Sequence, residues 1–135
     1  MVDASVAIKW AVPEDRFDLA VLVRARHDLM APELMIAECT NILWKKVGRG
    51  VLTGDEALDC AEVIATAGVS LAPAAPLMAD ALRLAVQLGH PAYDCFYLAL
   101  SQIADAPLVT ADERLRLKLV GTPFTILSLA EAAAA

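Results

Sequence analysis

The chain has 135 residues, of which 59% are hydrophobic, and a formal net charge of −6. This length and composition fit one ordinary domain over residues 1–135 and exclude a disordered protein or an acidic tail. The longest uncharged run, residues 63–79, contains Gly68, Pro73 and Pro76, which argues against a membrane span. The N-terminus has no basic segment followed by a long apolar one, so we expect no signal peptide. The three cysteines show no paired spacing, which is typical of a cytoplasmic protein.

Short apolar segments alternate with helical patterns along the chain. We expect helices at about Ala4–Trp10, Asp15–Asp28, Glu33–Val47, Thr53–Thr66, Leu77–Leu88, Ala92–Ala104 and Glu113–Leu119, and one after Ser128. We expect short strands at Met1–Asp3, Leu29–Ala31, Val69–Leu71, Leu108–Thr110 and Phe124–Leu127. This alternation predicts an α/β fold in which helices cover both faces of a parallel sheet.

Four acidic residues interrupt apolar segments, namely Asp3, Glu38, Asp94 and Asp112. Asp3 and Asp112 follow predicted strands, whereas Glu38 and Asp94 lie in the first turns of predicted helices. Ligands of open parallel sheets bind at the carboxyl ends of the strands, and the following helices start at that same edge. Because isolated buried carboxylates are costly, we expect the four to share one cleft with a cation.

Each acid also has a simpler interpretation. Asp3 could cap the helix that starts at Ala4, and Asp94 could complement a helix dipole. Asp112 could likewise be an N-cap, and Glu113 beside it is equally able to act as a ligand. Glu38 lies mid-segment, and the polar stripe that it forms with Asn41 and Lys45 could face either solvent or the cleft.

The chemistry of the donor set favours a hard cation. Cys39, Cys60 and Cys95 show no paired spacing and read as reduced core thiols, and His27 and His90 stand apart from any cluster, so a zinc site is not expected. Carboxylate oxygens prefer Mg²⁺, with Mn²⁺ as a substitute. Such a site suits phosphodiester hydrolysis.

Basic residues gather a few positions beyond two of the candidate ligands, although the net charge is negative. One cluster contains Lys45 and Lys46, the other begins at Arg114, and Lys9 is separate. They could be solvated helix faces. They could also form a rim that binds the phosphates of a nucleic acid.

Four segments of the chain resemble, in order, the acidic motifs of the PIN-domain family. They are Val2-Asp3-Ala4-Ser5-Val6-Ala7, Pro32-Glu33-Leu34-Met35-Ile36-Ala37-Glu38-Cys39-Thr40-Asn41, Tyr93-Asp94-Cys95-Phe96-Tyr97-Leu98-Ala99-Leu100 and Leu108-Val109-Thr110-Ala111-Asp112. Within that family the chain is most similar to the VapC toxins of bacterial and archaeal toxin–antitoxin pairs. Only Met1 and Val2 precede Asp3, where the family usually has several apolar residues, so either the first strand is unusually brief or the native start lies upstream of Met1.

The resemblance implies a three-layer α/β/α sandwich with a central parallel sheet and an Mg²⁺-dependent endoribonuclease activity. It implies Asp3, Glu38, Asp94 and Asp112 as the acidic quartet, with Asp3, Asp94 and Asp112 as metal ligands. Supporting polar residues are expected at Ser5, Asn41 and Thr110. It also implies an RNA substrate, a homodimer and a cognate antitoxin that occupies the cleft.

Three other classes of function share features with this chain. A signalling receiver domain needs an acidic pair at the first strand and a late strand-end lysine, and this chain has only Asp3 and no such lysine. A PIN-like domain that merely binds RNA or protein is disfavoured by the intact quartet. A housekeeping nuclease of the same fold, without an antitoxin, remains the alternative that sequence does not separate from a toxin.

Overall fold

A computed structural model describes residues 1–135. Its helices are α1 (Ala4–Ala7), η1 (Ile8–Trp10), α2 (Phe17–Arg26), α3 (Leu34–Gly48), α4 (Gly54–Ala65), η2 (Ala75–Leu77), α5 (Met78–Leu88), α6 (Ala92–Ala104), α7 (Glu113–Lys118) and α8 (Leu129–Ala134). Its strands are β1 (Met30–Pro32), β2 (Ser70–Ala72), β3 (Leu108–Val109) and β4 (Ile126–Leu127). None of the helices has the length and apolar character needed to cross a bilayer.

All strand pairs are parallel, and the start of the chain joins them. β1 pairs with β2, and β3 pairs with β4. Between these pairs, the Val2 amide donates to the Met30 carbonyl at 3.0 Å, and the Val109 amide donates to the Met1 carbonyl at 2.8 Å. The predicted first strand is thus a single bridge, Val2 to Val109, at the centre of the sheet.

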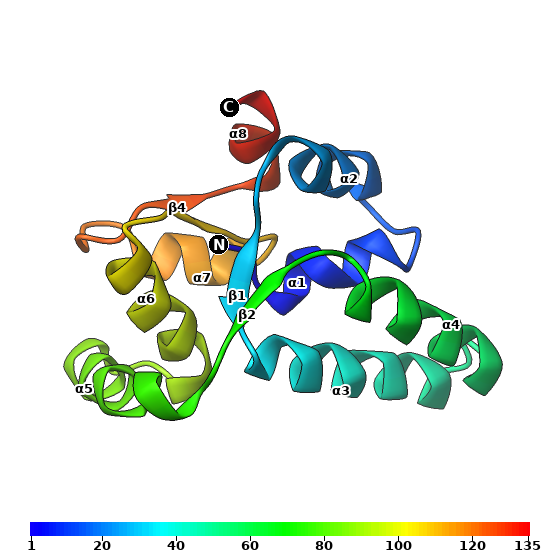
Figure 1. The fold of residues 1–135 in the computed structure, drawn as a ribbon, viewed down its shortest axis with the longest axis horizontal. Helices are drawn as coiled ribbons and strands as arrows, with labels where there is room; N and C mark the ends of the chain where they lie inside the picture. The colour runs from blue at the N-terminus through cyan, green and yellow to red at the C-terminus, as the bar shows by residue number, and fades with distance from the viewer.

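The layers follow from the crossovers between parallel strands. Helices α3 and α4 lie on one side of β1 and β2, and α5 and α6 lie on the other (Figure 1). The result is a three-layer α/β/α sandwich, as expected from the sequence. Because all strands run in one direction, the loops that leave their carboxyl ends gather along one edge.

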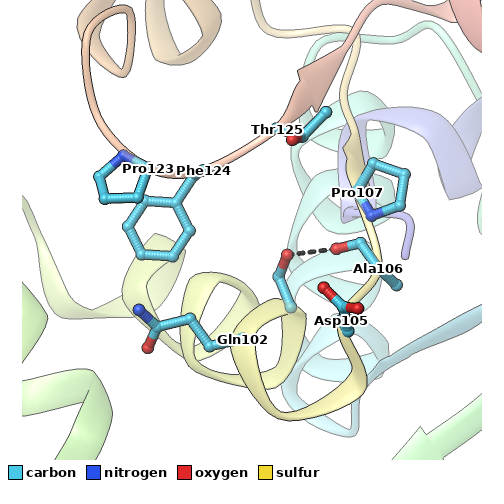
Figure 2. A pocket seen from close by; sticks show the side chains of 8 residues that line it. Gln102, Asp105, Ala106, Pro107, Pro123, Phe124 and Thr125 are labelled. Atoms are coloured by element: carbon cyan, nitrogen blue, oxygen red, sulfur yellow. Dashed lines mark hydrogen bonds between the residues drawn. The ribbon is translucent and has the colours of Figure 1, made fainter.

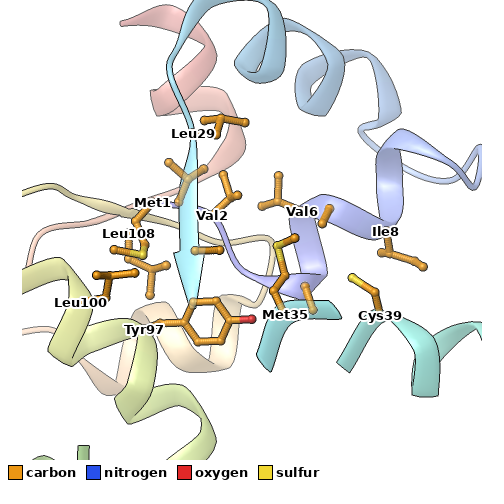
Figure 3. Close-up of a cluster of buried hydrophobic side chains, with 14 of the residues drawn as sticks. Met1, Val2, Val6, Ile8, Leu29, Met35, Cys39, Tyr97, Leu100 and Leu108 are labelled. Carbon is orange, nitrogen blue, oxygen red and sulfur yellow. The ribbon is translucent and has the colours of Figure 1, made fainter. Parts of the chain in front are cut away.

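The core is one hydrophobic cluster of 32 buried residues, drawn from Met1 through Ala133. Val2 and Leu108 are fully buried within it, and Tyr97 of α6 lies beside Met35 of α3 (Figure 3). Burial of each such aliphatic side chain contributes about 1.5–3 kcal/mol. This packing fixes the first residues of the chain, and therefore Asp3, against the centre of the sheet.

Several element boundaries differ from the sequence prediction by one or two residues. The helix expected from Asp15 begins at Phe17, because Arg16 has a left-handed backbone with φ of 62°. Pro32, expected to stop the second strand, belongs to β1. The Met30 carbonyl accepts the Val2 amide on the side of β1 that faces away from β2. Backbone groups two residues apart in a strand point to the same side, so the nitrogen of Pro32, which has no hydrogen to donate, also faces away from β2. On that side the chain after Val2 has already turned into α1.

Candidate active site at the carboxyl ends of the strands

The elements place all four acids at the carboxyl edge of the sheet. Asp3 follows the Val2 bridge and caps α1, where its Oδ1 accepts from the Val6 amide at 3.3 Å. Glu38 lies in the second turn of α3, which follows β1 directly, and Asp94 lies in the first turn of α6. Asp112 follows β3 and caps α7.

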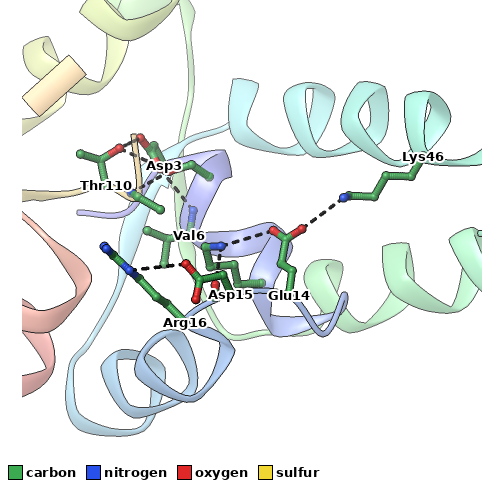
Figure 4. A network of polar contacts seen from close by, with 10 residues as sticks. Asp3, Val6, Glu14, Asp15, Arg16, Lys46 and Thr110 are labelled. Atoms are coloured by element: carbon green, nitrogen blue, oxygen red, sulfur yellow. Dashed lines mark hydrogen bonds and ion pairs between the residues drawn. The ribbon is translucent and has the colours of Figure 1, made fainter. Parts of the chain in front are cut away.

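Asp3 is the most buried of the four, with only 7% of its surface exposed. Ser5 Oγ donates to its Oδ1 at 2.5 Å, and Thr110 Oγ1 donates to its Oδ2 at 2.5 Å (Figure 4). The Ser5 and Thr110 hydroxyl groups in turn accept the amides of Ala111 and Asp112. The carboxylate is therefore held in a fixed orientation, but neither hydrogen bond brings a positive charge.

The acids influence one another's ionisation. Burial raises the pKa of Asp3 to about 6; its hydrogen bonds oppose that rise, and the nearby charge of Asp94 adds to it. Burial likewise raises the pKa of Glu38, with the charges of Asp3 and Asp94 contributing in the same direction. No lysine or arginine forms an ion pair with Asp3, Glu38 or Asp94. A partly buried acidic cluster of this kind fits a cation as its counter-charge.

Glu38 has a partner that sequence reasoning did not single out. The Tyr97 hydroxyl donates to Glu38 Oε1 at 2.6 Å, and burial followed by this bond raises the pKa of the Tyr97 phenol. Tyr97 lies three residues after Asp94, on the same face of α6. That spacing is the signal in the sequence that could have identified Tyr97.

Asp94 also has an unexpected partner. His90 Nε2 lies 2.6 Å from Asp94 Oδ2, whereas the sequence suggested that His90 stands apart; that expectation was wrong. The turn between α5 and α6 brings the two together across four residues. The spacing alone did not reveal the contact, because Gly89 and Pro91 make this stretch irregular.

Asp112 is placed differently from the other three. Its side chain is exposed, and its Oδ1 accepts the Arg114 and Leu115 amides at 3.0 and 3.2 Å, leaving Oδ2 without a hydrogen bond. The alternative ligand Glu113 is paired with Arg116 at 3.3 Å. No three His, Cys, Asp or Glu side chains converge closely enough to hold a metal ion in this structure. The charges of neighbouring acids thus affect Asp3 and Glu38, although the side chains of Asp3, Glu38 and Asp94 do not meet at one point.

Comparison with known proteins places this arrangement in a family. The PIN domain model matches residues 1–118. The chain is 33% identical over 118 residues to "Ribonuclease VapC3" of Pyrobaculum aerophilum, covering 85% of this chain and 90% of that protein. The chain belongs to the PIN-domain family. A crystal structure of PAE2754 from Pyrobaculum aerophilum has the same fold, with a TM-score of 0.71 and 27% identity over 99% of this chain and 88% of that one.

Next to the acids of this PIN domain lies an open groove. It has a volume of about 560 Å³ and is lined by Leu34, Ala37, Glu38, Asn41, Tyr93 and Phe96. Tyr93, which directly precedes Asp94, is 69% exposed. Asn41, expected as a supporting residue, therefore lines this groove and makes no hydrogen bond to the acids.

A second pocket lies away from the acids. It is lined by Ser101, Gln102, Asp105, Ala106, Pro107, Pro123, Phe124 and Thr125 (Figure 2). These residues come just before β3 and β4, so the pocket lies at the amino ends of those strands. Catalytic chemistry in this PIN domain is expected at the opposite edge.

The basic residues suggested as a phosphate rim divide into two kinds. Lys9 and Lys46 both contact Glu14, at 3.4 and 3.2 Å, and Lys9 also donates to the Asp15 carbonyl at 2.7 Å (Figure 4). Lys45 and Arg114 are exposed and form no ion pair. Only the second kind is immediately available to a phosphate.

Proposed function

We propose that this protein is an Mg²⁺-dependent endoribonuclease and the toxin of a type II toxin–antitoxin pair. The observation that carries the proposal is the group of acids Asp3, Glu38 and Asp94, which lies at the carboxyl edge of a PIN sheet without a lysine or arginine partner and in which the charge of Asp94 raises the pKa of Asp3 and of Glu38. The 33% identity to a protein named as a VapC ribonuclease supports RNA as the substrate.

Asp3 and Asp94 are proposed to hold the divalent ion, with Oδ2 of Asp112 as a third donor. A bound Mg²⁺, or Mn²⁺ in its place, would neutralise phosphate charge and activate a water for in-line attack. Ser5 and Thr110 hold both oxygens of Asp3 in place. Because Tyr97 binds Glu38 Oε1, Glu38 Oε2 is free to accept the proton of the attacking water.

The RNA is proposed to pass the groove beside Glu38. The exposed Tyr93 ring offers a stacking surface for a base, and Lys45 and Arg114 are placed on the surface for phosphates. Lys9 and Lys46 would join them only after leaving Glu14.

We also propose a homodimer in the cytoplasm, silenced by an antitoxin that covers the acidic cleft. Exposed apolar side chains such as Trp44 and Val86 are available for such contacts.

The decisive experiment is expression of the wild type and of Asp94→Asn in a growing bacterium, followed by mapping of new RNA ends. Growth arrest and defined cuts with the wild type, both absent with a folded Asp94→Asn variant, support the proposal. Purified wild type should cut single-stranded RNA with Mg²⁺ and not with EDTA. RNA cutting without growth arrest would favour a housekeeping nuclease, and RNA binding without cutting would favour a non-catalytic PIN-like domain.

A further inference from the structure

His90 occupies a rigid turn between α5 and α6, next to the proposed metal ligand Asp94. Its amide donates to the Ala85 carbonyl at 3.1 Å, where Gly89 takes the left-handed conformation that ends α5. Pro91 follows and fixes the entry into α6. The backbone that carries the imidazole is thus held on both sides.

The imidazole is largely buried, with 10% of its side chain exposed, and has a single polar partner. Nε2 lies 2.6 Å from Asp94 Oδ2. Because an ionised carboxylate offers only acceptor oxygens, Nε2 carries the proton of this bond. The other nitrogen, Nδ1, is buried and has no hydrogen-bond partner.

An unpartnered buried nitrogen is unfavourable, so packing alone would be served better by an apolar side chain. What His90 adds over an apolar residue is the hydrogen bond to Asp94. Asp94 is one-third exposed and has no other hydrogen bond, so this contact alone restrains its carboxylate. With Oδ2 bound to His90, Oδ1 is left for a ligand.

From this geometry we infer that His90 is a positioning residue that orients the Asp94 carboxylate for a divalent cation. The inference rests on the proposed metal site and adds a residue to it. Hydrogen-bond partners behind a ligating side chain typically change metal affinity about 10- to 100-fold when removed. His90 acts only through Asp94, so its effect should vanish when Asp94 can no longer bind the ion.

The test is Mn²⁺ binding to the purified protein, followed by the electron paramagnetic resonance signal of free Mn²⁺. His90→Leu removes the donor, His90→Gln keeps an amide N–H near the place of Nε2, and His27→Leu is the control at a histidine that contacts the Ala132 carbonyl instead. Melting curves in EDTA verify that each variant is folded. We expect about tenfold weaker Mn²⁺ binding for His90→Leu, and binding close to wild type for His90→Gln and His27→Leu.

A double-variant cycle completes the experiment. In an Asp94→Asn background, His90→Leu should cause no further loss of Mn²⁺ affinity. Equal Mn²⁺ affinity of wild type and His90→Leu would overturn the inference. So would an equal loss of Mn²⁺ affinity in His90→Leu and His90→Gln. A third contradicting result is that His90→Leu lowers Mn²⁺ affinity as much in the Asp94→Asn background as in the wild type. Absence of Mn²⁺ binding by the wild type would overturn the proposed metal site together with this inference, whereas failure confined to the His90 variants leaves that site standing.

Discussion

Replacing Asp3 by Asn should make the metal-free protein more stable at neutral pH. A carboxyl whose pKa is raised from 3.8 to about 6 holds its proton more tightly in the folded state, so stability falls as pH rises through this window. At about 1.4 kcal/mol for each pH unit, the raised pKa of Asp3 costs the folded state about 3 kcal/mol at pH 7.5, where Asp3 is ionised, and about 1 kcal/mol at pH 4.5, where folded Asp3 is protonated.

The neutral amide of Asn removes this penalty but accepts one hydrogen bond fewer. Ser5 and Thr110 now donate to the two carboxylate oxygens, and one of these hydroxyls must turn away from the amide nitrogen, at a cost of about 1 kcal/mol. The net gain of Asp3→Asn is then about 2 kcal/mol at pH 7.5 and close to zero at pH 4.5.

Urea unfolding in EDTA at the two pH values measures the gain, with Asp105→Asn at the far edge of the sheet as the matched control. Mg²⁺ at a hundredfold excess over its Kd should then add about 2.7 kcal/mol to the wild type and little to Asp3→Asn, which reverses their order. The reasoning is refuted if Asp3→Asn is less stable than wild type at pH 7.5 in EDTA, or if the difference does not change with pH.

Four further variants test the surroundings of the acids. Tyr97→Phe removes the donor to Glu38 and should lower kcat about tenfold or more with an unchanged fold; full activity in an RNA-cleavage assay would contradict the role given to Glu38. Lys45→Ala should reduce the slope of log Kd against log salt for RNA by about one, whereas Lys46→Ala, which releases Glu14, should instead lower stability by up to about 1 kcal/mol; a salt slope changed equally by both would refute this division. Tyr93→Ala should weaken binding of single-stranded RNA by about 1–3 kcal/mol, and unchanged affinity in a fluorescence-anisotropy titration would remove the groove from the RNA path.

Local signals in the sequence predicted the boundaries of helices well where a capping residue or a helix breaker sets the boundary. The Thr53 to Glu56 capping box is present with both hydrogen bonds, and the helix expected at Ala92–Ala104 has those bounds. Boundaries failed where tertiary contacts decide them. The left-handed Arg16 and the inclusion of Pro32 in β1 depend on neighbours that no local pattern encodes.

In the candidate site, too, some features followed from the sequence and others depended on the tertiary structure. Alternation of strands and helices was enough to bring Asp3, Glu38, Asp94 and Asp112 to one edge, because the direction of a parallel sheet fixes where its helices begin. Side-chain orientation was only partly predictable. The N-cap interpretation of Asp112 is confirmed, with one oxygen turned onto its own helix. Tyr97 of α6 reaches Glu38 of α3 only in the tertiary structure, and His90 reaches Asp94 through the irregular turn between α5 and α6.

The Val2 bridge joins the two halves of the sheet. The amides of Val2 and Val109 donate the hydrogen bonds between the β1–β2 pair and the β3–β4 pair. Asp3 directly follows Val2, so loss of these two bonds would release Asp3 from its place beside the other acids. Hydrogen exchange at Val2 and Val109 should therefore slow when a cation binds, so that an ion held by the acids would also tie the two halves of the sheet together.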